Sequence, residues 1–367
     1  MNNIEKEKPF EYLRRKNGEC YTSETIRNWY IARAFVLDKL KDVCICQGMK
    51  ERLHVVINGD SPLMLSVARQ VALSAHYANF DERHHNRSVI TIVSKDAQTF
   101  EELQKEEYLC NLPRYCKCSV NGTEPINSGS YIDLEIQLVE TWNPDDALDA
   151  IVMTENDVKN FVSTKNEDDI FNIDTRKAVL AQRIYSLGSW IDNLPAENIH
   201  DVERYAMALN VFKHNLLKKP TEALVDEKLW KNDLTIVKTG LSNIFCTDCF
   251  ESTVAGLKLY GETHDLTEDE TMEHCIESIS KCEHSRWVVE KLIMGFRPLN
   301  EQERLIDERS FGNKKFQYRN ELKKNAHDPA HIDLCSFAEL RRINPSDLKY
   351  DSFLMLAMPD IVKQCKP

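Results

Sequence analysis

The sequence predicts an α/β protein in which a parallel-sheet domain precedes a helical middle region and a mainly α-helical C-terminal domain. Two short apolar runs, His54–Gly59 and Ser88–Val93, are typical of buried strands. Leu63–Tyr77 lies between them and carries apolar residues at helical spacing. Strands that alternate with helices indicate a parallel sheet with helical crossovers.

The chain before the first strand is expected to be helical. Thr22 and Ser23 offer N-caps, and apolar residues recur near helical spacing over Ile26–Val43. We expect Gln47-Gly48 to end this segment, which packs on the domain that follows.

The first strand and its turn resemble the start of a Rossmann nucleotide-binding half. Gly59 ends the strand, Ser61 can cap the next helix with Pro62 at its first position, and Asp96 follows the second strand. The glycine fingerprint is degenerate, because Gly59 alone remains and Asp60 brings negative charge close to any phosphate. Gly59, Asp60, Ser61 and Asp96 are therefore weak cofactor-binding candidates. Two interpretations stay open: a structural shell without a tight cofactor, and a working nucleotide site.

Asp96 lies 37 residues beyond Gly59, against about 20 in the simple motif, and an insertion at Asn79–Asn86 would account for the excess. Further along the chain we expect two more strands, then helices, then a charged loop. The expected strands are Ile132–Val139 and Ala150–Thr154; the clearest helices are Ala178–Ile184, Val202–Phe212 and Ser252–Tyr260, the last ended by Gly261; the loop is Asn300–Asn325.

These elements divide the chain into five parts. Residues 1–50 form an N-terminal helical segment, 51–155 a Rossmann-like α/β domain, and 156–261 a mostly helical region that completes or extends it. Residues 262–270 are an acidic linker, and 271–367 form the C-terminal helical domain.

Composition limits the classes of function. The chain has 367 residues, 42% of them hydrophobic and 29% charged, with a net charge of −12. This acidic balance argues against broad nucleic-acid binding, which depends on neutralising phosphates. No apolar run approaches the ~20 residues that span a bilayer, and Met1–Arg15 is polar and charged, so we expect a cytoplasmic protein without a transmembrane segment.

Motifs for catalysis or for a metal are lacking. Cys246 and Cys249 have zinc-ligand spacing among twelve cysteines, but no second pair follows at the distance of a zinc finger. The sequence contains no serine-nucleophile elbow, no phosphate-binding glycine–lysine loop and no zinc-protease motif. We therefore predict no metal site and no catalytic residue.

Residues Glu283 to Lys291 form the most informative segment. On a helix, Glu283, Trp287, Lys291 and Met294 share one stripe, because residues three and four apart are neighbours. The simplest interpretation is a Trp that anchors the helix to a small core, beside a solvated Glu–Lys pair. An aromatic side chain between an acid and a base can also pack with its apolar body and present a polar edge.

The segment Glu283-His284-x-x-Trp287-x-x-x-Lys291-x-x-x-Gly295-Phe296 resembles the first helix of the ryanodine-receptor repeat (RyR) domain, which also occurs in bacterial proteins. His331-Ile332-Asp333-Leu334 to Glu339-Leu340 is similar to its second half. The likeness runs from about Glu273 to Val362. It departs at Ile332 and Ser336, where the family usually has prolines.

The whole arrangement resembles bacterial proteins that join a Rossmann-like domain, similar to nucleotide-binding regulatory domains of potassium channels, to a terminal RyR domain. The resemblance implies a sensor in bacterial signalling or phage defence, with an adenine nucleotide or an NAD-derived compound as ligand and a homo-oligomer or effector protein as partner. The implied ligand-binding residues are Glu283, His284, Arg286, Trp287, Lys291, His331 and Asp333. Two alternatives remain: an NAD(P)-dependent oxidoreductase or nucleotide-processing enzyme, and a protein-interaction scaffold.

Overall fold

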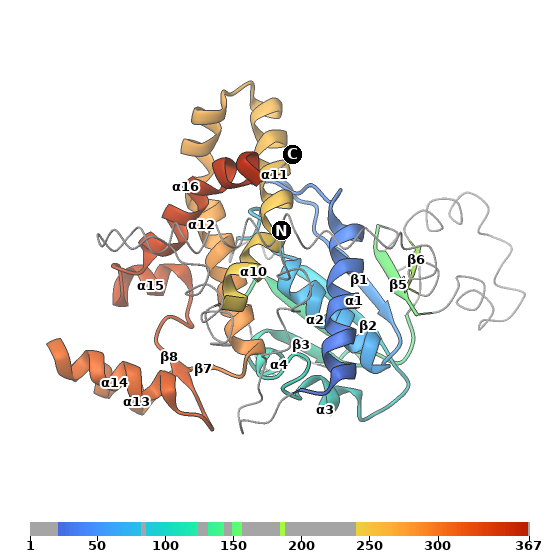
Figure 1. The fold of residues 1–367 in the computed structure, drawn as a ribbon, viewed down its shortest axis with the longest axis horizontal. Helices are drawn as coiled ribbons and strands as arrows, with labels where there is room; N and C mark the ends of the chain where they lie inside the picture. The colour runs from blue at the N-terminus through green and yellow to red at the C-terminus, as the bar shows by residue number, and fades with distance from the viewer. Residues whose placement is uncertain are drawn as a thin grey trace, which may run out of the picture.

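A computed structural model describes residues 21–81, 86–123, 131–142, 149–155, 184–187 and 240–365. Within these ranges six strands form one parallel sheet in the order β3-β4-β2-β1-β5-β6 (Figure 1). The α/β class and the helical C-terminal region are confirmed. The strands are β1 (His54–Asn58), β2 (Ser88–Val93), β3 (Lys117–Val120), β4 (Leu134–Val139), β5 (Ile151–Thr154) and β6 (Ile184–Ser186).

The central β1–α2–β2 unit folds as its sequence predicts. The Ser61 hydroxyl accepts a hydrogen bond from the backbone N–H of Met64, and Pro62 opens α2 (Pro62–Ser74). Helix α1 (Ser23–Leu40) is capped in the same way by Thr22. It ends before the expected Gln47-Gly48 stop. β1 and β2 are buried along most of their length, as is usual for strands covered on both faces.

The two edge strands were not predicted. β3 pairs with β4, but its sequence, Lys-Cys-Ser-Val, has no apolar run to reveal it. β6 pairs with β5 from Ile184 onward, so the expected helix Ala178–Ile184 is wrong at its last residue. Pairing with a neighbouring strand decides the conformation of short edge segments. The rest of that helix, and the one expected at Val202–Phe212, lie outside the described residues.

Helices from both ends of the chain pack on the sheet domain. α1 and α2 lie side by side in front of the sheet, and α12 (Glu268–Ile293) packs against α2 as well (Figure 1). The main hydrophobic core therefore joins strand residues such as Ile57 and Ile90 to Val289 and Leu292 of α12. No helix in the described ranges is long and apolar enough to cross a membrane.

Helix α12 also belongs to a second core. Its first half, with Cys275 and Ile279, packs on α10 (Gly240–Asp248), α11 (Phe250–His264) and α16 (Leu348–Cys365). At ~1.5 Å per residue this helix is about 39 Å long, which lets it cross from one core to the other. The segment around Trp287 lies in the second half of α12, where the two cores approach each other.

The expected helix end at Gly261 is wrong. α11 continues through Gly261 to His264 and ends at Asp265, which adopts a left-handed conformation. Residues 262–270, expected to be a linker, form the last residues of α11, a short turn and the first turn of α12. Gly261 serves packing, because a Cβ at this position would lie 2.6 Å from Thr271 Oγ1 on α12.

We expect Gly261→Ala to lower the free energy of unfolding by about 1–2 kcal/mol. Alanine favours a helix by about 1 kcal/mol, but overpacking a tight contact costs about 1–3 kcal/mol. Chemical denaturation of a double-mutant cycle measures the balance. In a Thr271→Ala background the same substitution should be neutral or stabilising; an equal loss in both backgrounds would refute the contact.

The expected charged loop Asn300–Asn325 is also wrong. It folds into α13 (Glu301–Arg309) and α14 (Gly312–Lys324), and Asn300 and Glu303 form a capping box at the start of α13. Beyond them β8 (Ala330–His331) pairs in parallel with β7 (Arg297–Pro298). This short pairing returns the chain to the end of α12 and places His331 beside Trp287.

Candidate functional site

The predicted stripe on α12 exists, but its charged residues are buried. Trp287 is partly exposed, and the Lys291 ammonium lies 5.7 Å from the centre of its indole ring. The Glu283 and Lys291 side chains are each only 7% exposed. The interpretation of a solvated Glu–Lys pair is therefore wrong, because α10 and the C-terminal helices cover this part of α12.

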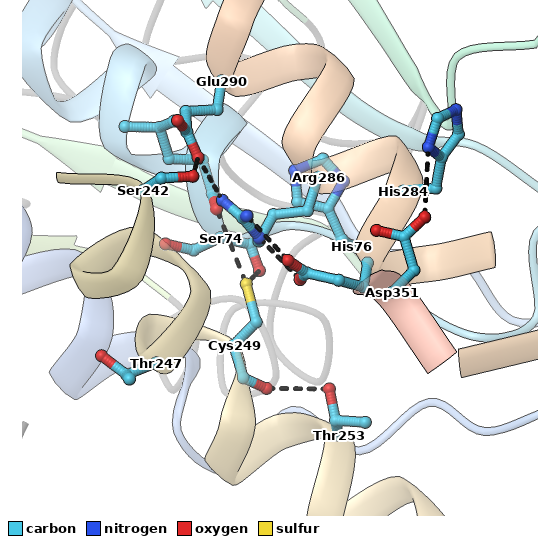
Figure 2. Close-up of polar contacts among 12 residues, drawn as sticks. Ser74, His76, Ser242, Thr247, Cys249, Thr253, His284, Arg286, Glu290 and Asp351 are labelled. Atoms are coloured by element: carbon cyan, nitrogen blue, oxygen red, sulfur yellow. Dashed lines mark hydrogen bonds and ion pairs between the residues drawn. The ribbon is translucent and has the colours of Figure 1, made fainter. Parts of the chain in front are cut away.

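The buried charges form one network (Figure 2). The Arg286 guanidinium donates two hydrogen bonds to Glu283, at 2.7 and 2.8 Å, and one to Glu290 Oε2, at 2.7 Å. Glu290 also accepts hydrogen bonds from Lys291, at 2.6 Å, and from Ser242 of α10, at 2.9 Å. Two cations face two carboxylates, so Arg286 is neutralised internally and is poorly placed to hold a phosphate.

His284 and Asp351 form a second buried pair, which joins α12 to α16 (Figure 2). His284 Nε2 lies 2.9 Å from the carbonyl oxygen of Cys335 and so carries a proton, while Nδ1 lies 3.4 Å from Asp351 Oδ2. Burial alone lowers the pKa of His284, but the hydrogen bond and charge of Asp351 raise it above its usual value. Burial also raises the pKa of Asp351. Both shifts favour a proton held between the two side chains, leaving the pair with no net charge.

The chain from β8 onward faces Trp287. His331 lies edge-on to Trp287, with ring centres 4.9 Å apart. Its Nδ1 accepts a hydrogen bond from the Asp333 backbone N–H at 3.2 Å. Burial and the nearby Lys323 and Lys291 hold the pKa of His331 well below its usual range. The ring is therefore neutral, with its proton on Nε2.

These walls enclose a pocket of about 350 Å³. Six of the seven predicted ligand-binding residues line it: Glu283, His284, Arg286, Trp287, His331 and Asp333. Lys291 is not among its lining residues and packs against the indole instead. Sequence reasoning missed six polar or aromatic lining residues: Ser242, Asn243, Lys323, Asp347, Tyr350 and Asp351. Lys323 lay in the segment expected to be a loop, which hid its position on a helix that ends near the pocket.

Ser336 occupies one of the positions where the resembled family carries proline. Its hydroxyl accepts a hydrogen bond from the Glu339 backbone N–H at 3.1 Å and caps α15 (Phe337–Ile343). Serine at an N-cap starts a helix as well as a proline would in the first turn. Leu340 of this helix also lines the pocket.

The weak cofactor candidates meet at the carboxyl ends of β1 and β2. Gly59 has a φ of +128°, which favours glycine. The Asp60 carboxylate accepts hydrogen bonds from Ser94 and Thr99, so it ties the two strand ends together. Asp96 accepts a hydrogen bond from the backbone N–H of Gln98. The Asp60 and Asp96 carboxylates thus accept hydrogen bonds from residues near the strand ends. Asp60 also places negative charge where a phosphate would lie.

Cys246 and Cys249 are both buried at the end of α10. Burial raises the pKa of each thiol, and Cys249 Sγ lies 3.6 Å from the carbonyl oxygen of Leu73 (Figure 2). Thiols in such an environment remain protonated and pack as small apolar groups. Among the residues with described positions, no three His, Cys, Asp or Glu side chains are grouped to hold a metal ion.

Comparisons with protein-family models, with curated proteins and with solved structures find no match to this chain. The pocket beside Trp287 is thus interpreted from its own geometry and chemistry.

Proposed function

We propose that the protein is a non-catalytic cytoplasmic sensor that binds a small nucleotide-type ligand in the pocket beside Trp287. The observation that carries this proposal is the partly exposed indole at the wall of a 350 Å³ pocket that also holds His331 and Asp333. An aromatic face, an N–H donor and a carboxylate acceptor match the face and edges of a nucleobase. The residue pattern shared with RyR domains supports the same reading and implies recognition without catalysis.

The position of the pocket suggests how binding could be signalled. Its lining residues come from α10, α12, α14, α15 and α16 and from the segments that flank α15, so a ligand would contact elements of both hydrophobic cores. A ligand that binds one arrangement of these helices more tightly than another shifts the population between them. An effector protein or a second copy of the chain would respond to that shift, as bacterial signalling or phage defence requires.

Replacing Trp287 with alanine is expected to weaken ligand binding by about 1–3 kcal/mol, the usual loss when a base–aromatic stack is removed. Isothermal titration of the wild type and the variant against purine nucleotides, NAD, ADP-ribose and cyclic nucleotides measures this loss of binding free energy. Trp287→Phe should keep most of the affinity, because a ring face remains. Absence of heat with every compound at millimolar concentration would rule out the proposal.

A scaffold role makes a different prediction for the same variants. There, Trp287→Ala would lower the melting temperature while no nucleotide changed the melting temperature of either protein. Thermal unfolding with and without the nucleotide panel therefore separates the sensor from the scaffold.

The sheet domain offers a second candidate, a Rossmann-like nucleotide site. The strand order turns back between β1 and β5, and open parallel sheets bind ligands at such a point, beyond the strands' carboxyl ends. Gly59 lies there with its positive φ. An enzyme that used this cleft would retain a dinucleotide, so native mass spectrometry of fresh protein tests it. A mass equal to that of the bare chain would favour the sensor.

A further inference from the structure

Asp333 is a buried charged group in the wall of the pocket. The residue is only 7% exposed. Its Oδ1 accepts a hydrogen bond from the Asn344 amide at 2.9 Å, and the same amide nitrogen donates to Asp347 at 2.7 Å. The ring nitrogen of His331 that lies 3.7 Å from Oδ2 is Nδ1, which already accepts from the Asp333 backbone and so has no proton to give. The Asp347 carboxyl also lies within hydrogen-bonding reach of Asp333. Two carboxyl groups in contact can share only one proton, and the same Asn344 amide nitrogen donates to both.

A buried carboxylate that faces a second carboxyl group is costly, and burial together with the neighbouring Asp347 raises the pKa of Asp333 to about 6. The carboxylate is therefore mostly ionised at pH 7.5. A buried carboxylate needs hydrogen-bond partners, and a donor group of a ligand would supply one to Asp333. Because Asp333 lines the pocket together with Trp287, that ligand would lie against the indole.

Hydrogen-bond donors also line the pocket. His331 carries its proton on Nε2, and Lys323 of α14 brings an ammonium group. Burial lowers the pKa of Lys323, while the charges of Asp333 and Asp347 oppose that shift. The pocket therefore combines two carboxyl groups, those of Asp333 and Asp347, with the N–H donors of His331 and Lys323 and one aromatic face. The carboxylates outnumber the cations once the Arg286 network and the His284–Asp351 pair are set aside as neutral.

We infer that the pocket binds a guanine base, with Asp333 accepting hydrogen bonds from its N1–H and 2-amino group; this inference rests on the proposed function. Guanine presents two adjacent donors that match one carboxylate, and its 6-oxo and N7 acceptors suit the His331 N–H and Lys323. Adenine presents a single amino group next to the N1 lone pair, which a carboxylate repels. The adenine ligand expected from the family resemblance is therefore disfavoured by this geometry.

Titration of the full chain with a matched series of nucleoside monophosphates tests the inference, because sugar and phosphate stay constant. GMP should bind at least tenfold more tightly than IMP, which lacks the 2-amino group, and more tightly than AMP. Sites built to bind a polar group discriminate strongly against analogues that lack it. Similar affinities for GMP and AMP, within threefold, would overturn the inference, as would tighter binding of a quaternary ammonium compound.

Asp333→Asn supplies the decisive variant. Its amide would donate to the 2-oxo group of xanthine, so the preference should move from GMP to XMP by at least tenfold. An unchanged order of affinities would overturn the assignment. The variant should fold, because it removes a half-satisfied buried charge, and its melting temperature without ligand should be no lower than that of the wild type. A purely structural Asp333 would instead lose stability on substitution.

The pH dependence of GMP binding gives an independent readout. The groups facing Asp333 are Asn344 and Asp347 from the turn before α16, His331 from β8, and Lys323 from α14. Protonation of Asp333 below pH 6 removes the acceptor, so GMP affinity should fall at least fivefold from pH 7.5 to pH 5. The affinity of the wild type for AMP should not fall in this way, nor should the nucleotide affinity of the Asp333→Asn variant.

The outcomes separate this inference from the function on which it rests. Suppose that the wild type binds several nucleotides, that Trp287→Ala binds none, and that Asp333→Asn keeps the wild-type order of affinities. That result would support the sensor and refute selection of guanine. No binding of any nucleotide by the wild-type chain would refute both.

Discussion

Glu290→Gln is expected to lower the free energy of unfolding by about 3–5 kcal/mol, the usual effect of breaking a buried ion pair from one side. The Glu290 side chain is fully buried and receives Arg286, Lys291 and Ser242. Glutamine keeps the volume but removes the charge, which leaves two buried cations facing one carboxylate. Urea denaturation monitored by tryptophan fluorescence measures the change.

The control for this prediction lies on the same helix. Glu277 pairs with Lys281 and Arg341, but its side chain is 57% exposed. Exposed pairs contribute about 0–1 kcal/mol, so Glu277→Gln should have a small effect. Equal effects at the two positions would show that the network around Glu290 is not buried in solution.

The same network predicts sensitivity to acid. Burial by itself raises the pKa of Glu290, but the charges and hydrogen bonds of Lys291 and Arg286 lower it below the usual 4.5. A carboxyl whose pKa is lower in the folded state contributes stability above its unfolded pKa and loses it as the pH falls. The difference between wild type and Glu290→Gln should therefore be present at pH 7 and shrink below about pH 4.5.

Asp248→Asn is expected to cost about 3–5 kcal/mol for the same physical reason. Asp248 at the end of α10 accepts two hydrogen bonds from Arg33 of α1, at 3.0 and 2.7 Å, and its side chain is fully buried. Gln70 of α2 also donates to it at 3.3 Å. One carboxylate thus joins three helices, and its neutralisation removes the charge that faces the buried Arg33 guanidinium. Thermal and chemical unfolding both report the loss.

Asp38→Asn is the matched control for Asp248. Asp38 lies on α1 and pairs with Lys39 and Lys41, but its side chain is 34% exposed. We expect a change below about 1 kcal/mol there. A loss at Asp248 no larger than at Asp38 would contradict the assignment of the Arg33–Asp248 pair as a link between the N-terminal helix and α10.

Local patterns predicted the centre of the fold well. The Ser61-Pro62 start of α2, the apolar run of β1 and the Thr22 cap of α1 are decided by a few neighbouring residues, and each is confirmed. The edge strands β3 and β6 were not predicted, because only their partners β4 and β5 stabilise the extended conformation. Residues 300–325 were wrongly predicted as a loop because their high charge hides two helices whose apolar side chains, such as Leu305 of α13 and Phe316 of α14, stay exposed.

The sequence by itself determined the class of fold, the helix that carries Trp287 and the polar residues of that helix, because helical spacing and capping are local properties. Only the tertiary structure decided which of those residues are available to a ligand. Arg286 and Lys291 were predicted to bind the ligand, yet packing of α10 and the C-terminal helices buries them against Glu283 and Glu290. Asp333 faces a pocket whose other walls come from distant segments, such as Ser242 of α10 and Asp351 of α16. Burial and charge pairing depend on residues far apart in the chain, and no local pattern records them.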